Sequence, residues 1–164
     1  LEKGDFQSAA EEYARALPLF MEMEDRAAVS AIRHSQGLIQ VQGGEKELAA
    51  KSFQEALSIN QELGDRAAEA GSFFQLGALA VQQEHMAEGL RLMATAAVVL
   101  RSIKSNEVKN VEPLVERLAS QLDFSQEQFM AMVQEVVQGY AKDRGWGLVE
   151  RALASHDGEG ERKR

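Results

Sequence analysis

The sequence repeats itself with a step of forty residues, and this restricts the chain to folds built from a recurring unit. The tetrapeptide Asp-Arg-Ala-Ala occupies residues 25–28 and returns at residues 65–68. The same step relates small residues to small residues and bulky ones to bulky ones. The matched sets are Gly37 and Gly77; Tyr13, Phe53 and Met93; Ala16, Ala56 and Ala96; and Ala9, Ala49 and Gly89. Periods of roughly 20–50 residues are typical of solenoids and related repeat folds.

Each repeat contains two amphipathic helical patterns. Between residues 45 and 63, small and apolar residues recur every three to four positions, which places one apolar stripe on a helix. Gly64 suits the end of that helix, and Asp65 can cap the next one. Pro18 lies inside the first predicted helix and should kink or end it. The predicted helices span residues 5–22, 26–42, 45–63, 66–83, 86–103, 107–121, 126–141 and 145–154.

Composition agrees with helices and narrows the function classes. The chain has only two prolines and is rich in good helix formers such as Ala, Leu, Glu and Gln. Its net charge of -8 disfavours contact with phosphate backbones, so we expect no nucleic-acid partner. The absence of cysteine excludes disulfides and is compatible with the cytoplasmic location that we predict. No apolar stretch is long enough to cross a membrane, so we expect no membrane partner.

Three segments carry a more specific pattern. Residues 73–80 read Phe-x-x-Leu-Gly-x-x-Ala, and residues 49–56 read Ala-x-x-x-Phe-x-x-Ala. A weaker copy, Arg-x-x-Gln-Gly, occupies residues 33–37. These segments resemble the tetratricopeptide repeat, or TPR, whose signature is Trp-x-x-Leu-Gly-x-x-Tyr followed by Ala-x-x-x-Phe. Because the usual TPR has about 34 residues, the sequence resembles a lengthened variety of the family, and it lacks the late proline of the signature.

The resemblance implies an all-α fold, namely an α-solenoid of antiparallel helix pairs (a TPR-like superhelix) with a degenerate C-terminal helical cap. In the repeat frame Arg117 stands where Gly is expected, and Phe129 stands where Ala is expected. The frame also begins at the second helix of a repeat, so we expect either that the parent protein continues N-terminally or that this edge pairs with another chain. The implied organisation is a helical-repeat domain at 1–155, with best-formed units at 25–63 and 65–103, a partial unit at 1–24, a degenerate unit or cap at 105–155, and a flexible polar tail at 156–164.

In TPR stacks the first helix of each repeat lines a concave face. The resemblance therefore implies a protein–protein interaction scaffold that binds a peptide or an amphipathic helix on that face. The lysine and asparagine clamp of some TPR proteins is absent, since His34 and Phe74 occupy two of its positions. Part of the implied face could instead be core between neighbouring helices. The implied partner-binding residues are Ala31, His34, Leu38, Val41, Phe74, Gln75, Ala78, Val81, Leu114 and Leu118.

Two alternative functions remain open. In a self-association (oligomerisation) module, Phe6, Tyr13 or Trp146 would contact a second copy of the chain. Trp146 could equally be a buried contact that seats the last helix. In the second alternative, the repeats are a regulatory arm of a larger multidomain protein.

The sequence offers no pattern that predicts catalysis. His34, His85 and His156 lie in different predicted elements, and none belongs to a His-x-x-x-His pair. We therefore expect no enzyme activity, no metal and no cofactor.

Overall fold

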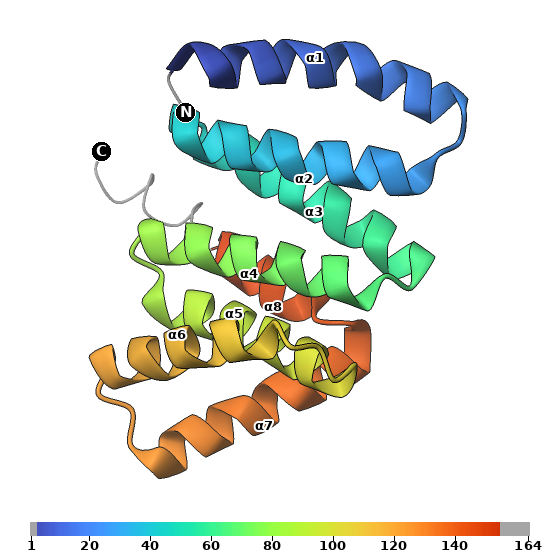
Figure 1. Ribbon diagram of the computed structural model, residues 1–164. Helices are drawn as coiled ribbons and strands as arrows, with labels where there is room; N and C mark the ends of the chain where they lie inside the picture. Colours follow the sequence, from blue (N-terminus) through green and yellow to red (C-terminus); the bar gives the residue numbers. More distant parts are fainter. Residues whose placement is uncertain (1–2, 155–164) are drawn as a thin grey trace. The chain divides into compact units, whose positions relative to one another are not determined.

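The computed structural model describes residues 3–154, and within that range the backbone forms α-helices and no strand (Figure 1). The helices are α1 (Lys3–Glu22), α2 (Arg26–Gly43), α3 (Lys46–Leu63), α4 (Arg66–Gln82), α5 (Met86–Ser102), α6 (Val108–Gln121), α7 (Gln126–Asp143) and α8 (Trp146–Ala154). The all-α prediction is confirmed, and every predicted helix end lies within two residues of the observed one. The predicted tail at 156–164 and the side chain of Phe6 lie outside the described part of the chain.

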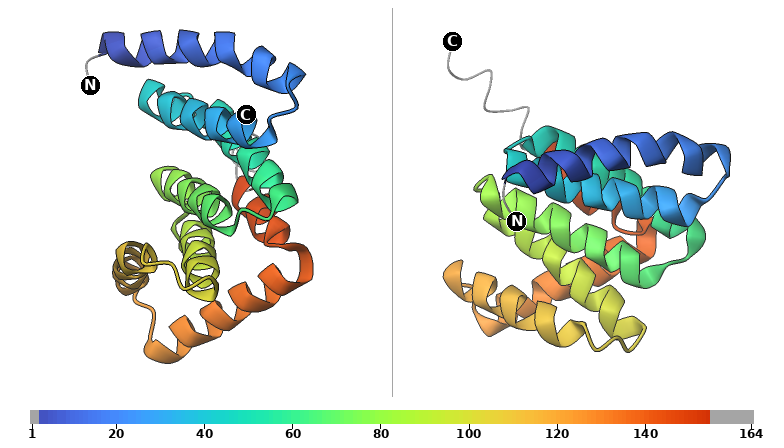
Figure 2. Two further views of the ribbon diagram at one scale, coloured as in Figure 1. Left: turned by 45° about the vertical axis from the view of Figure 1, so that its right-hand side comes forward. Right: turned by 45° about the horizontal axis from the view of Figure 1, so that its top comes forward.

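The chain divides into two compact units, residues 1–72 and 73–164, with the boundary inside α4. In the first unit α2 packs against both α1 and α3, and Figure 2 shows α1 lying beside α2. In the second unit α5 is the central helix, because α6, α7 and α8 all pack on it. None of the described helices combines the length and apolar character needed to cross a membrane.

One backbone turn ends each of the first five helices and recurs every twenty residues. Its central residue has a positive φ in all five cases. These residues are Glu24 (56°), Gly44 (78°), Gly64 (73°), Glu84 (67°) and Lys104 (55°). After α3, for example, Gly64 N–H donates to the Gln61 carbonyl, and Asp65 N–H donates to the Asn60 carbonyl at 2.9 Å. This hydrogen-bond pair defines a Schellman motif. The forty-residue sequence period therefore corresponds to two helix-and-turn steps.

Two of the helices that follow these turns, α2 and α4, begin with the same aspartate N-cap. The side chain of Asp25 accepts a hydrogen bond from the Ala28 N–H, and that of Asp65 accepts one from the Ala68 N–H, at 3.0 Å in each case. A carboxylate at this position satisfies a donor that has no partner within the helix. The predicted roles of Gly64 and Asp65 are confirmed.

Pro18 does not end the first helix. α1 continues through Pro18 to Glu22, and Figure 1 shows that the ribbon bends in this part without breaking. Of the two effects predicted for Pro18, a kink or a helix end, the structure shows a bend (Figure 1), and the helix predicted at 5–22 is observed. Proline removes one N–H donor and leaves the Ala14 carbonyl without its helical partner. Because Ala14 and Pro18 are both exposed, water can hydrate that carbonyl.

Glycine allows close helix crossings in both units, as the repeat predicts. A Cβ built on Gly37 of α2 would lie 2.5 Å from Cε1 of Phe53 on α3, whose side chain is fully buried. A Cβ built on Gly77 of α4 would lie 2.7 Å from Cγ of Met93 on α5. Phe53 and Met93 are forty residues apart, so equivalent bulky side chains fill the space beside equivalent glycines.

Candidate functional site

Four of the predicted partner-binding residues lie on α2 of the first unit. Ala31, His34, Leu38 and Val41 follow one another at intervals of three or four residues, so they share one face of the helix. Ala31 is exposed and Leu38 is 40% exposed, whereas His34 and Val41 are half-buried. The first unit therefore presents a short, largely apolar strip on α2.

His34 packs against the core of the first unit. The centroid of its ring lies 5.4 Å from that of Phe53, and its Cε1 lies 3.9 Å from the position of a Cβ on Gly71. Burial lowers the pKa of His34 because desolvation disfavours the charged imidazolium. The side chain is therefore neutral near pH 7, and it extends the apolar strip without adding a cation.

The other predicted residues lie in the second unit, on α4 and α6. Phe74, Gln75, Ala78 and Val81 are half-buried on α4. Val81 takes part in the crossing with α5, since its Cγ2 lies 2.5 Å from the position of a Cβ on Gly89. On α6, Leu114 is half-buried, but Leu118 is only 7% exposed and belongs to the core. Leu118 was predicted because the resemblance to the TPR family implies a position on the concave face, and the sequence does not reveal which face a neighbouring helix covers.

The residues predicted for self-association are only partly accessible. Tyr13 on α1 and Trp146 at the start of α8 are both half-buried, while the side chain of Phe6 is not described. The side chains that seat α8 in the second unit come later in the helix and are almost fully buried. They are Leu148, Val149 and Ala152.

The turn before α8 covers Phe73, the residue at the tryptophan position of the repeat pattern. Arg144 and Gly145 both have positive φ, and a Cβ on Gly145 would lie 2.7 Å from Cζ of Phe73. The Phe73 ring also meets the ring of Tyr140 edge-on, with centroids 6.1 Å apart. Only glycine allows the backbone to approach the Phe73 ring so closely.

A bridging carboxylate links three helices of the second unit. Glu135 on α7 forms ion pairs with Arg91 on α5 at 3.2 Å and with Arg151 on α8 at 2.8 Å. Partial burial raises the pKa of Glu135, but hydrogen bonds from Arg151 and Arg91 outweigh that effect, so the pKa lies below its usual value. The ionised carboxylate helps to hold α8 against α5 and α7.

The α6–α7 pair is open, unlike the closely packed α2–α3 pair. Both helices pack on α5, but they make little contact with each other, and Figure 2 shows α7 diverging from α6 beyond the connection at residues 122–125. Arg117 and Phe129 stand forty residues after Gly77 and Gly89, the glycines at the α4–α5 crossing. Side chains of this size are incompatible with so close a crossing, which explains why the two helices remain apart.

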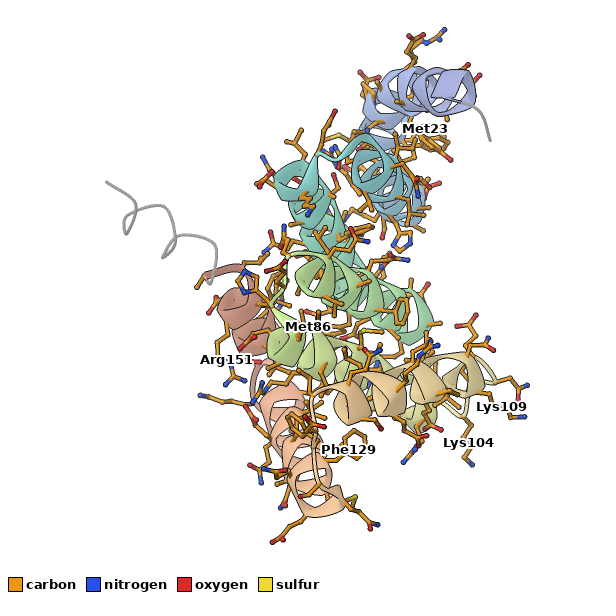
Figure 3. The ribbon with its side chains drawn as sticks, turned by 90° about the vertical axis from the view of Figure 1, so that its left-hand side faces the viewer. Met23, Met86, Lys104, Lys109, Phe129 and Arg151 are labelled. Carbon is orange, nitrogen blue, oxygen red and sulfur yellow. The ribbon has the colours of Figure 1, made fainter. Side chains whose placement is uncertain are left out.

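A groove of about 250 Å³ lies between α6 and α7 and has α5 as its floor. We call it the α6–α7 groove. It is lined by Ala94, Ala97, Val98 and Arg101 of α5, by Glu112, Val115 and Glu116 of α6, and by Phe129, Met130 and Val133 of α7. Figure 3 shows Phe129 between α6 and α7. None of these residues was predicted as a site. The sequence did carry a signal, because Arg117 and Phe129 replace the small residues that close packing of the two helices requires.

Charged side chains line one side of the groove. Arg101 Nε donates to Glu112 Oε1 at 3.0 Å, so these two charges compensate each other. Glu116 follows one turn later on α6, is exposed, and has no ion pair with any described residue. The groove therefore combines apolar walls with one uncompensated negative charge.

Neither the search for metal ligands among the described residues nor the comparison with known proteins indicates a second kind of site. Within residues 3–154 there is no group of three or more His, Asp or Glu side chains placed to hold a metal ion. No protein-family model matches the sequence, and no curated protein matches it.

Proposed function

We propose that the chain is a cytoplasmic scaffold for protein–protein interaction, built as a TPR-like α-solenoid that binds a peptide or an amphipathic helix of another protein. The observation that carries the proposal is the repeated unit: the same turn every twenty residues, and glycine crossings at Gly37 and Gly77. In repeat proteins each unit contacts mainly its neighbours, and the stack presents an extended surface to partners. The proposal assigns the chain no catalytic step, metal or cofactor.

The binding surface that we propose for each unit consists of the accessible residues of the predicted set in that unit, on α2 in the first unit and on α4 and α6 in the second. Leu38 and Ala31 are exposed on α2, Phe74 and Ala78 are half-buried on α4, and Leu114 is half-buried on α6. Apolar side chains at helical spacing suit the apolar face of an amphipathic helix. The neutral state of His34 supports a partner whose contacting residues are apolar and not acidic.

A crosslinking pull-down with the full chain tests this proposal. Leu38→Glu and Phe74→Glu place a charge on the proposed surface, so we expect both variants to lose the partner that the wild type recovers. Leu48→Glu is the matched control, because Leu48 is 51% exposed on α3 and lies outside the proposed surfaces. Undiminished recovery by Leu38→Glu and Phe74→Glu, with helical content intact by circular dichroism, would exclude this surface.

Self-association is the second candidate function, and the end of α1 favours it. Leu19, Met21 and Met23 are 60%, 56% and 71% exposed, so three large apolar side chains lie in water within five residues. Exposed apolar residues that cluster in this way often mark an interface. Light scattering over a dilution series distinguishes the two functions, since a strict monomer at high concentration rules out self-association.

A further inference from the structure

We propose that the α6–α7 groove is a docking site for an amphipathic helix that carries lysine or arginine beside its apolar stripe. The inference rests on the proposed function, because it assumes a protein partner. It goes further by placing that partner on a surface that helix pairing leaves open, and by specifying the chemistry of the docking segment.

The size and shape of the groove suit side chains of a helix. Its volume of about 250 Å³ lies below the range of roughly 300–1,000 Å³ that is typical of small-molecule sites. The floor contains the small side chains of Ala94 and Ala97, which leave depth for an inserted apolar group. One or two apolar side chains of a partner would fill this space.

α7 extends the apolar wall beyond the groove itself. Met130, Val133 and Val137 follow at intervals of three and four residues, so they form one stripe on the helix. Met130 is 62% exposed and Val137 is 45% exposed. Apolar side chains with this spacing can pack against the matching stripe of a second helix laid alongside. The open α6–α7 pair thus exposes apolar side chains where a helix can lie.

The charge of the groove selects among possible helices. Glu116 is the lining charge that has no ion pair with any described residue, whereas Arg101 and Glu112 pair with each other. The chain as a whole carries a net charge of -8. Lysine or arginine next to the apolar stripe of a partner would be attracted to Glu116 and to the net negative charge of the chain.

The same charge disfavours a second copy of the chain as the occupant. The exposed apolar end of α1, at residues 19–23, is the surface of this chain best suited to enter an apolar groove. This segment contains Glu22 and is followed by Glu24, and both carboxylates would lie near Glu116 in such a complex. Like charges brought together oppose association, so a basic helix of a different protein is the better occupant.

Two synthetic amphipathic helices test the inference. Both carry the same leucine stripe, and the polar face bears lysine in one peptide and glutamate in the other. Fluorescence anisotropy with the full chain at physiological salt should give saturable binding of the lysine peptide and much weaker binding of the glutamate peptide. Met130→Glu, at an exposed position, should weaken the lysine peptide about tenfold or more, whereas Leu48→Glu, at a 51% exposed position on α3, should leave its affinity unchanged.

Charge reversal supplies the second arm of the test. Glu116→Lys should weaken the lysine peptide and strengthen the glutamate peptide, while Glu47→Lys, an equal change of net charge at an exposed site on α3, should leave both affinities nearly unchanged. Equal effects of Glu116→Lys and Glu47→Lys would show general charge attraction and would overturn the inference. Failure of both peptides to bind would overturn it as well.

The outcome also separates this inference from the proposed function. If Leu38→Glu or Phe74→Glu abolishes binding of the lysine peptide but Met130→Glu does not, the groove is not the docking site, and the proposed surface on α2 or on α4 is supported. Thermal unfolding of each variant by circular dichroism shows whether a loss of binding reflects the surface or the fold.

Discussion

Gly77 and Gly89 lie against each other's backbone where α4 crosses α5. A Cβ on Gly77 would lie 2.9 Å from the carbonyl oxygen of Gly89, and a Cβ on Gly89 would lie 2.7 Å from the carbonyl oxygen of Gly77. Backbone atoms cannot swing aside as a flexible side chain can. The two helices would therefore have to separate to accommodate even one methyl group, and the close packing around α5 would be disturbed.

Replacing Gly77 with alanine should consequently destabilise the second unit. We expect Gly77→Ala to lower the free energy of unfolding by about 1–3 kcal/mol, because the added methyl overpacks the crossing. Urea denaturation measures the change. Gly43→Ala is the control: it lies at the end of α2, and its Cβ would meet only the Glu45 side chain, at 3.7 Å or more. If Gly77→Ala is as stable as the wild type, the crossing does not require glycine.

The turns that end the helices predict a substitution that stabilises the chain, in contrast to Gly77→Ala. Glu84 has a φ of 67°, close to the values for Gly44 and Gly64 in the equivalent turns. A left-handed conformation strains any residue with a Cβ, and glycine relieves that strain. Glycine also loses more conformational entropy on folding, so the net effect of Glu84→Gly should be a rise of about 0.5 kcal/mol in the free energy of unfolding. Thermal denaturation detects this gain.

A glycine in an ordinary helical position serves as the control for the turn. Lys51→Gly, at an exposed site inside α3, should instead lower stability by about 1 kcal/mol. In the reverse direction, Gly64→Ala should also destabilise the chain, although a Cβ there meets no atom within 4 Å. A loss of stability on Glu84→Gly would contradict the strain that we assign to this turn.

The helices could be predicted from the sequence because the signals that set them are local. Apolar spacing marks the stripe of each helix, and Gly64 and Asp65 mark an end and a start within two adjacent residues. The sequence could not decide whether Pro18 kinks its helix or ends it, since that depends on whether the carbonyl that it leaves free can reach water. That depends on the exposure of Ala14, which the sequence pattern does not report.

The candidate site was less predictable because it depends on contacts between distant segments. The family resemblance implied that Leu118 lies on the concave face, but only the position of the neighbouring helices shows that this side chain is buried. Arg117 and Phe129 were recognised as departures from the repeat. The sequence did not indicate that their bulk would open a groove over Ala94 and Ala97, since that requires knowing that α6 and α7 both rest on α5.

Glu135→Gln should weaken the attachment of α8, with an effect that depends on pH. The pKa of Glu135 lies below its usual value in the folded chain, so its contribution to stability is present above pH 4.5 and is lost as the pH falls through the lower, folded-state pKa. Because the carboxylate is 40% exposed, the loss near pH 7 should be about 1 kcal/mol or less.

Chemical denaturation of Glu135→Gln at several pH values and salt concentrations tests this contribution. The difference from the wild type should shrink in acid and in high salt, since both weaken the ion pairs with Arg91 and Arg151. Glu150→Gln is the control, because it removes the same charge at an exposed position on α8 and leaves the Glu135 ion pairs in place. A difference that is independent of both conditions would mean that the ion pairs do not stabilise the unit.

His34 makes the stability of the first unit sensitive to mild acid. Burial lowers its pKa below the ordinary value of 6.5, so the unfolded chain binds a proton more readily than the folded chain does. His34 therefore destabilises the fold progressively as the pH falls below about 6.5, and it has no such effect above that value. Thermal unfolding between pH 7.5 and pH 5.5 should show a falling midpoint for the wild type and a flatter profile for His34→Gln. Parallel profiles for the wild type and His34→Gln would show that His34 takes up a proton as easily in the folded unit as in the unfolded chain.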